Sequence, residues 1–245
     1  MQLDALAFGA HPDDVELSCA GTLIKLHCRG YKTGVISLTR GELGTRGSAE
    51  IRAKEFQEAA EIMGLSTHTI LDIPDGNIEA KWENKIKIIC KIRAHKPKIV
   101  LAPFWEDRHP DHGHTSHLVR EAAFLAGLKR IETDQEAHRP YRVIYYPCRF
   151  EFRPSFIVDI TEFHDCKMKA IQAYKSQFHN PEKSHYGEEE TNVSRAEFLE
   201  AIVTRAKQYG SHIGVSYGEP FLVREPLRLD DPVASFGPES LQGFL

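Results

Sequence analysis

The sequence predicts a single α/β domain built on a Rossmann-like, open and mostly parallel sheet that is flanked by helices. Apolar segments of strand length alternate with segments of helical periodicity, which is the pattern of such a sheet. The chain has 245 residues, 41% apolar and 27% charged, and is long enough to bury a large core without disulfide or metal staples. Because no repeat and no linker divides it, we expect one domain over residues 1–245, with a core of about 1–223 and an irregular tail at 224–245.

The expected elements follow from local signals. Strands are bounded by proline, which cannot continue a ladder, and helices by glycine stops such as Gly30 and Gly64. The predicted strands are 3–10, 33–39, 68–73, 98–104, 141–148 and 156–161, and the predicted helices are 16–28, 48–63, 82–94, 114–129, 162–176 and 195–208. After Tyr217 the sequence shows little periodicity.

Composition excludes several classes of partner. Lys and Arg number 31 against 35 Asp and Glu, a net charge of −4, so the chain has no excess positive charge for a nucleic acid. The five cysteines are odd in number and contain no C-x-x-C pair, which argues against disulfides and a thiolate zinc site and favours a cytoplasmic location. The first residues do not resemble a secretory signal, and the longest apolar stretch is far below the ~20 residues that span a bilayer, so we expect no membrane partner.

Histidine and aspartate gather where predicted strands end. In open parallel sheets ligands bind at the carboxyl ends of the strands, which here selects the loops 11–14, 40–48 and 105–112. No glycine-rich nucleotide fingerprint and no G-x-S-x-G nucleophile motif is present. Imidazole and carboxylate groups from separate strand ends are the ligands of catalytic zinc.

The first motif is His11-Pro12-Asp13-Asp14. Adjacent carboxylates point in different directions, so one can bind a cation while the other accepts a proton from a metal-bound water. An aspartate before a helix is also a common N-cap, and the local sequence leaves both interpretations open.

The second motif is His109-Pro110-Asp111-His112. One histidine can bind the metal while the other crosses the cleft, and Asp111 can fix the tautomer of a ring. The alternative is a solvated loop before a helix. His114 and His117 fall within that helix and are interpreted as capping or surface residues.

A charged cluster, Arg40, Glu42, Arg46 and Arg52, follows the second strand. A guanidinium there could bind a carboxylate through two hydrogen bonds. Exposure to solvent would equally account for each of these charged residues taken alone. Arg52 falls in the first turn of a helix, where the macrodipole disfavours a cation, and this hints at another role.

Together these motifs resemble a known family. AHPDD after the first strand and HPDH after a later one are similar to the zinc-dependent deacetylases of the PIG-L/LmbE-like superfamily. The segments LTRGELGTRGSAEIRAKE, IPDGNIE, APFWEDRHPDH, AYKSQF and IGVSYGEPF resemble the bacillithiol biosynthesis deacetylases, which act on N-acetylglucosaminyl malate, over a range ending at about Phe221.

The resemblance implies a role for each residue of the motifs. It implies one Zn²⁺ per chain, although iron(II) or cobalt would suit the same ligands. Asp13 would be the general base, His109 would stabilise the oxyanion or protonate the amine, Asp111 would orient a histidine, and Arg52 would bind the substrate. In part of the family a tyrosine assists the oxyanion; here Phe198 falls in that region, and three alternatives stay open: Tyr186, Tyr217 or no tyrosine at all. The zinc ligands would be His11, Asp14 and His112.

The resemblance also implies a reaction and partners. We expect hydrolysis of the acetamide of an N-acetylglucosaminide, with a small N-acetylated sugar as substrate and a homo-oligomer, trimeric or hexameric, as the assembly. Two alternatives stay open: an amidase or deacetylase for a thiol conjugate or another N-acetyl sugar, and a non-catalytic metal- or sugar-binding module.

Overall fold

A computed structural model describes residues 1–179 and 189–236 of the chain. Its centre is a five-stranded parallel sheet in the order β3-β2-β1-β4-β5, with every neighbouring pair parallel. The strands are β1 (Ala5–Gly9), β2 (Thr33–Ser37), β3 (Thr67–Ile70), β4 (Ile99–Pro103) and β5 (Arg142–Tyr146). This is the predicted Rossmann-like architecture. The order reverses between β1 and β4, which places the carboxyl ends of these two neighbours at the topological switch point.

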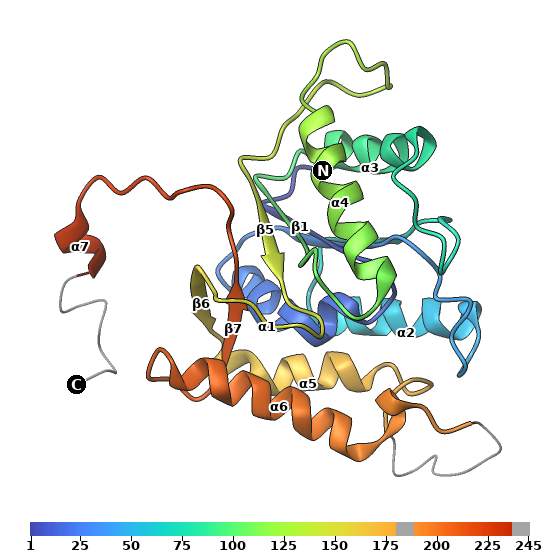
Figure 1. Ribbon diagram of the computed structural model, residues 1–245, viewed down its shortest axis with the longest axis vertical. Helices are drawn as coiled ribbons and strands as arrows, with labels where there is room; N and C mark the ends of the chain where they lie inside the picture. Colours follow the sequence, from blue (N-terminus) through green and yellow to red (C-terminus); the bar gives the residue numbers. More distant parts are fainter. Residues whose placement is uncertain (180–188, 237–245) are drawn as a thin grey trace.

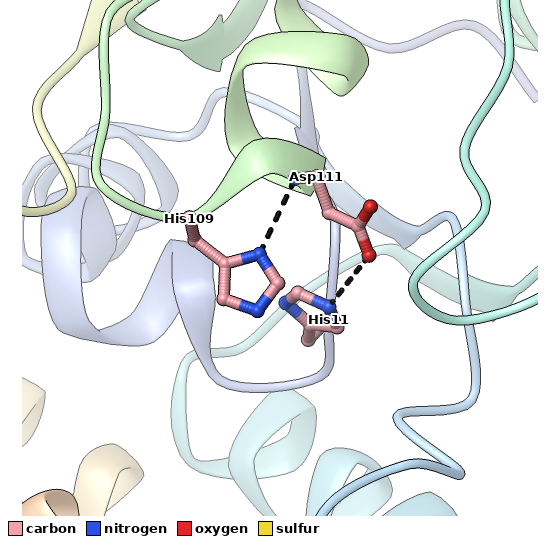
Figure 2. A group of neighbouring side chains, drawn as sticks. All are labelled: His11, His109 and Asp111. Atoms are coloured by element: carbon pink, nitrogen blue, oxygen red, sulfur yellow. Dashed lines mark hydrogen bonds and ion pairs between the residues drawn. The ribbon is translucent and has the colours of Figure 1, made fainter.

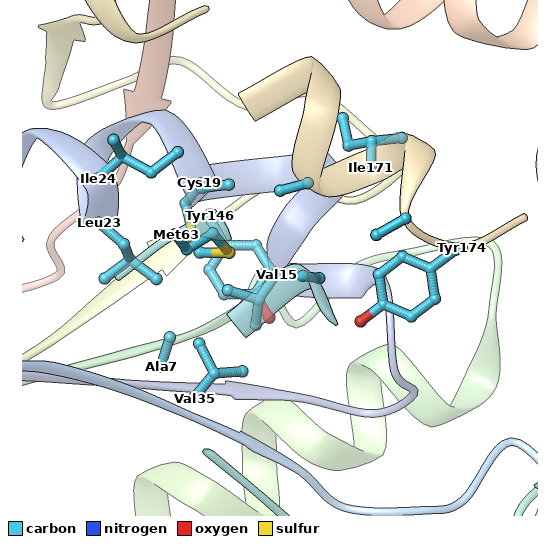
Figure 3. Packing of buried hydrophobic residues seen from close by; sticks show 14 of the residues in the cluster. Ala7, Val15, Cys19, Leu23, Ile24, Val35, Met63, Tyr146, Ile171 and Tyr174 are labelled. Carbon is cyan, nitrogen blue, oxygen red and sulfur yellow. The ribbon is translucent and has the colours of Figure 1, made fainter. Parts of the chain in front are cut away.

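Helices cover both faces of the sheet (Figure 1). Alternate residues of β1 point to opposite sides: Ala5 and Ala7 join one buried cluster, and Leu6 and Phe8 join the other. The main helices are α1 (Asp14–Cys28), α2 (Ala49–Ile62), α3 (Trp82–His95), α4 (Pro110–Leu125), α5 (His164–Gln172) and α6 (Ala196–Ser211). Figure 3 shows the first cluster, in which α1 and α5 pack on the sheet through residues such as Val15, Leu23 and Ile171. Helices α3 and α4 cover the opposite face.

The C-terminal part of the chain adds a second, small sheet. Strands β6 (Phe156–Asp159) and β7 (Gly218–Phe221) pair antiparallel, and Leu222 then bridges to Tyr145 at the edge of the main sheet. Short helical turns η1 (Thr161–Phe163) and η3 (Asn192–Ser194) precede α5 and α6, and α7 (Pro232–Phe236) lies in the tail.

A buried carboxylate from β7 supports a break in α1. Cys19 has non-helical φ/ψ of −140° and 18°, which frees backbone donors in the next turn. Glu219 accepts hydrogen bonds from Gly21 N at 3.0 Å and Thr22 N at 2.7 Å, and from Lys167 Nζ at 2.7 Å. Gly21 is required here because a Cβ would lie 3.0 Å from Glu219 Oε1 and 2.8 Å from Ile160. The break in α1 is therefore fixed from the far end of the chain.

The structure corrects four sequence-based expectations. The helix after the second histidine motif was predicted to begin at residue 114, but α4 begins at Pro110, because proline suits the first helical position. The predicted strand 156–161 is outside the main sheet, and its partner β7 was missed because Gly-Glu-Pro-Phe carries no strand signal. The predicted helix 162–176 is shorter, and the tail holds the helix α7.

Two further findings concern the cysteines and the length of the helices. All five cysteines are free. Across residues 1–179 and 189–236, no helix is both long enough and apolar enough to cross a membrane.

Candidate metal and catalytic site

The two histidine motifs meet at the switch point of the sheet. His11-Pro12-Asp13-Asp14 follows β1 and His109-Pro110-Asp111-His112 follows β4, and these strands are neighbours. Asp14 begins α1 and His112 lies in the first turn of α4. Both helices therefore start at the same point, each bringing one carboxylate or imidazole to the edge of the sheet.

His11, Asp14 and His112 form a group that could hold a metal ion, since their ligand atoms lie within 4.8 Å of one another. One oxygen of Asp14, Oδ1, lies 3.1 Å from His112 Nε2, and the other, Oδ2, lies 3.5 Å from His11 Nδ1. The backbone N–H of His11 donates to Asp14 Oδ2 at 2.8 Å and holds the carboxylate in place. The set of two imidazoles and one carboxylate suits a catalytic divalent metal.

A further carboxylate holds the far side of each imidazole. His11 Nε2 lies 3.0 Å from Asp75 Oδ1 and 3.4 Å from Asp111 Oδ2, and His112 Nδ1 lies 2.8 Å from Asp107 Oδ1. Each ring thus turns one nitrogen to Asp14 and the other to an outer carboxylate. Histidines that ligate metals are oriented in this way, so these residues fit a resident metal ion.

The same contacts set the charges of the group. Burial disfavours charged imidazoles, but the carboxylates around His11 and His112 outweigh it and raise both pKa values well above their ordinary range. Burial would raise the pKa of Asp14, yet His112 and His11 hold it well below its usual value. The carboxylates around the two rings therefore favour positive charge at this place. A divalent cation would supply that charge instead of the ring protons.

Asp13 lines the same cavity as this group but does not belong to it. It occupies the N-cap position of α1 with φ of 113°, yet its side chain makes no capping hydrogen bond. A left-handed conformation in a non-glycine residue costs about 1–3 kcal/mol and is typical of functional sites. Burial raises the pKa of Asp13 to about 6, against the opposing charge of Arg52. Asp13 thus has the properties of a proton acceptor rather than those of a helix cap.

Arg52 holds Asp13 in this position. Its Nη2 donates to Asp13 Oδ2 at 3.0 Å and to the carbonyl of Pro12 at 2.6 Å, and its Nη1 donates to the carbonyl of Gly41 at 3.1 Å. Gly41 has φ of 65°, and a Cβ there would lie 2.0 Å from Arg52 Nη1. Arg52 as a whole is only 5% exposed. Its position in the first turn of α2 is explained by these contacts, and its predicted contact with substrate stays a prediction.

His109 caps α4 with its ring (Figure 2). Its Nδ1 accepts the N–H of Asp111 at 3.3 Å, which leaves the proton of the neutral ring on Nε2. Burial, with the charges of His11 and His112, lowers its pKa and favours that neutral form. The exposed ring lies 4.8 Å from that of His11, centroid to centroid, so Nε2–H is available to a ligand beside the metal group.

Asp111 also contacts His11, on the side away from Asp14. It is 1% exposed and accepts the N–H of Gly76 at 2.8 Å. His11, His109 and Asp111 form a second group whose ligand atoms lie within 4.8 Å of one another (Figure 2). Because it shares His11 with the first group, the two are parts of one centre.

A cavity of about 320 Å³ opens on this centre. One wall is apolar and includes Phe178 and Phe198, whose rings stack at 5.8 Å. Of the tyrosines considered for the oxyanion, Tyr186 lies outside the described residues, and Tyr217 stacks on His164 at 3.6 Å and does not line the cavity. The polar lining includes His11, Asp13, Asp14, Arg52, Asp75, His109 and His112.

The structure brings all seven predicted site residues together, but sequence reasoning missed two of their partners. Asp75 lies in the segment IPDGNIE and received no role of its own, although it follows β3 at the same edge of the sheet. Asp107 was passed over in a charged loop, although it precedes HPDH. Both aspartates lie shortly after the end of a strand, and this position is the signal by which they could have been predicted.

The other residues of the charged cluster, and the two histidines further along α4, either contact neighbouring groups or are exposed. Glu42 accepts the N–H of Asp75, and Arg46 donates to the carbonyl of Ser176. Arg40 is exposed, as are His114 and His117 on α4, in agreement with their interpretation as surface residues.

Curated proteins similar to this chain catalyse two kinds of reaction. A diacetylchitobiose deacetylase of Thermococcus kodakarensis is 31% identical over 71% of this chain and 69% of its own. A 4-oxalmesaconate hydratase of Pseudomonas putida is 29% identical over 73% and 75%. A probable N-acetyl-alpha-D-glucosaminyl L-malate deacetylase 2 of Bacillus anthracis is 28% identical over 69% and 78%.

A solved structure and a family model give the same relationship. The crystal structure of a conserved protein from Thermus thermophilus matches with a TM-score of 0.84 at 38% identity, over 94% of this chain and 98% of that one. The family model described as PIG-L, GlcNAc-PI de-N-acetylase, matches residues 6–123, a range that contains both histidine motifs. This chain therefore belongs to the PIG-L family of the LmbE-like deacetylase superfamily.

Proposed function

We propose that this protein is a zinc-dependent N-deacetylase that hydrolyses the acetamide of an N-acetylglucosaminide, with N-acetylglucosaminyl malate as the substrate that its sequence favours. The observation that carries the proposal is the separation of two adjacent carboxylates. Asp14 lies between His11 and His112, whereas Asp13 lies outside this group, bound to Arg52. A protein that only binds metal has no need of a second, buried carboxylate held as a base beside the ion.

The chain's own residues supply the acid and base steps. A divalent metal held by His11, Asp14 and His112 would polarise the acetyl carbonyl and lower the pKa of water. Asp13 accepts a proton from the attacking water, since its pKa of about 6 leaves it largely ionised at neutral pH. His109 donates from Nε2 to the oxygen on which negative charge develops. The C–N bond then breaks, the proton held by Asp13 passes to the leaving nitrogen, and acetate and a free amine result.

The substrate class rests on the comparisons and on the cavity. Two of the three relatives described above are named for deacetylation of N-acetylglucosamine derivatives. The cavity of about 320 Å³ sets an apolar wall with Phe178 and Phe198 opposite polar groups, an arrangement suited to the two faces of a sugar ring.

The direct test is acetate release from N-acetylglucosaminyl malate by the purified protein, before and after chelation, with the metal content measured on the same sample. We expect release that chelation abolishes and that one zinc per chain restores. Bound zinc without release of acetate from N-acetylglucosaminyl malate or from other N-acetyl sugars and thiol conjugates would contradict the proposal.

The hydratase relative provides the second candidate. Addition of water to a carbon–carbon double bond also needs an activated water and a base, and that relative is 29% identical to this chain. Adding 4-oxalmesaconate to the same preparation distinguishes the two reactions, because hydration removes its conjugated absorbance and releases no acetate.

A further inference from the structure

The cavity has a cationic wall that the proposed chemistry does not use. Arg149 follows β5, and Arg205 lies on α6; both line the cavity. Arg205 donates from Nη1 to the carbonyl of Cys148 at 2.5 Å and from Nη2 to that of Leu17 at 3.5 Å. The guanidinium carbon of Arg149 lies 5.1 Å from the centroid of the Phe198 ring, also on α6. The loop after β5 and helix α6 therefore hold two guanidinium groups on one side of the opening.

Neither guanidinium has a carboxylate as a direct partner in the described part of the chain, although the charge of Glu151 acts on Arg205. Among residues 1–179 and 189–236, no ion pair within 4.0 Å includes Arg149 or Arg205. Carbonyl oxygens and an aromatic ring orient a guanidinium but leave its charge in place. The exposed side chain of Arg149 also keeps free N–H groups toward solvent. This wall therefore attracts an anionic group.

Arg52 is a further cation beside the metal group, and three of its five N–H groups are already used. Both of its terminal nitrogens donate within the chain, to Asp13, Pro12 and Gly41. Of its five N–H groups one on Nη1 remains, together with that at Nε, which is buried and finds no partner among the described residues. A substrate carboxylate that bound to Nη2 of Arg52 would displace Asp13 and so remove the base.

We propose that Arg149 and Arg205 form a carboxylate-binding subsite that selects N-acetylglucosaminides with an anionic aglycone, whereas Arg52 is a positioning residue for Asp13. This inference rests on the proposed deacetylase function. The planar fork of a guanidinium matches a carboxylate, and stacking on Phe198 fixes the plane of Arg149. The dicarboxylate of a malyl group supplies one partner for each arginine.

The test compares two substrates that differ only in the aglycone: N-acetylglucosaminyl malate and the neutral methyl N-acetylglucosaminide. For Arg149→Gln we expect the ratio of kcat/KM between the malyl and methyl substrates to fall about 10- to 100-fold, mainly through KM, the effect of losing a charged hydrogen bond. Arg149→Lys should recover part of the ratio, because it restores charge without the fork. The matched control is Arg130→Gln, an exposed arginine outside the cavity lining, which should leave both substrates unchanged.

Each result bears on a separate claim. An unchanged ratio in Arg149→Gln, or an equal loss with both substrates, would overturn the subsite. Arg108→Gln removes another arginine that lines the cavity. If it lowers the ratio as much as Arg149→Gln does, the selectivity comes from the general charge at the opening, and the proposed subsite is wrong. A wild-type protein that cleaves the methyl substrate but not the malyl one would keep the deacetylase and reject this inference. Cleavage of neither substrate would reject the proposed function itself.

Discussion

Asp107 Oδ1 lies 2.8 Å from His112 Nδ1, while the opposite nitrogen of the same ring lies 3.1 Å from Asp14. Asp107 also accepts the N–H groups of His109, Arg149 and Phe150. One buried carboxylate therefore orients a metal-binding ring and joins the loop before α4 to the loop after β5.

We predict that Asp107→Asn weakens zinc binding by about 10- to 100-fold, the usual effect of losing a carboxylate behind a ligating histidine. Competition with a chromophoric chelator measures this affinity directly. Asp165→Asn is the matched control, since its side chain is 99% exposed. Unchanged affinity in a folded Asp107 variant would show that His112 needs no anionic partner.

The two adjacent aspartates should separate in their effects. Asp13→Asn should lower kcat about 10²- to 10⁴-fold, as expected for loss of a general base, and retain zinc. Asp14→Asn should lose zinc because Asp14 faces both imidazoles. Zinc content and kcat are measured on the same samples. If the Asp13 variant loses as much zinc as the Asp14 variant, the assignment of Asp13 as base and Asp14 as ligand is wrong.

Arg52→Gln should lower kcat more than it raises KM, because Asp13 loses the donor 3.0 Å away that fixes its carboxylate. The removed charge also opposes the rise of the Asp13 pKa, so the acid limb of the kcat profile should move to higher pH. A rise in KM alone, with the pH profile unmoved, would instead support direct binding of substrate by Arg52.

The buried pair Lys167 and Glu219 should make a large contribution to stability. Removing one partner leaves an uncompensated charge, so Lys167→Met should lower the free energy of unfolding by about 3–5 kcal/mol. Lys167→Met combined with Glu219→Gln should recover part of this loss, since the charge is then removed as well. Urea denaturation of zinc-loaded protein measures both. The exposed pair Lys175 and Glu58 is the control, for which we expect under about 1 kcal/mol.

His164 should make the fold sensitive to acid. The ring is 4% exposed, stacks on Tyr217, and has a pKa lowered by burial and by the charge of Lys167. Because the unfolded chain binds a proton more readily below the ordinary histidine pKa of about 6.5, this residue contributes a loss of stability as pH falls below that value. His164→Phe should therefore lose less unfolding free energy between pH 7.5 and 5.5 than the wild type. His114→Gln, at an exposed position, should behave like the wild type.

The sequence predicted the sheet and the two motifs because their signals are local. His11 and His112 each lie next to an apolar strand, and the strand-end rule brings such loops together without knowledge of packing. The separate roles of Asp13 and Asp14 came only from the family resemblance, since spacing treats adjacent carboxylates alike. The left-handed backbone at Asp13 now gives the physical basis for the difference.

What the sequence did not predict depends on distant contacts. Asp75 lies in a Pro-Asp-Gly-Asn turn, and turn propensity alone explains that sequence. Strand β7 is defined by its pairing with β6 and not by its own residues. The contact of Glu219 with α1 joins positions 198 residues apart, and no local pattern indicates it.

That contact also has a consequence for synthesis of the chain. Helix α1, which begins with Asp14, is translated before the other described helices, but the carboxylate that accepts the N–H of Gly21 is made 198 residues after that glycine. A nascent chain that has not reached Glu219 keeps two buried donors and Lys167 without their partner, a costly state for a core. The helix that carries Asp14, one of the three proposed metal ligands, can therefore reach its final structure only after Glu219 has been made, and ribosome-bound chains that stop short of β7 should remain dependent on chaperones.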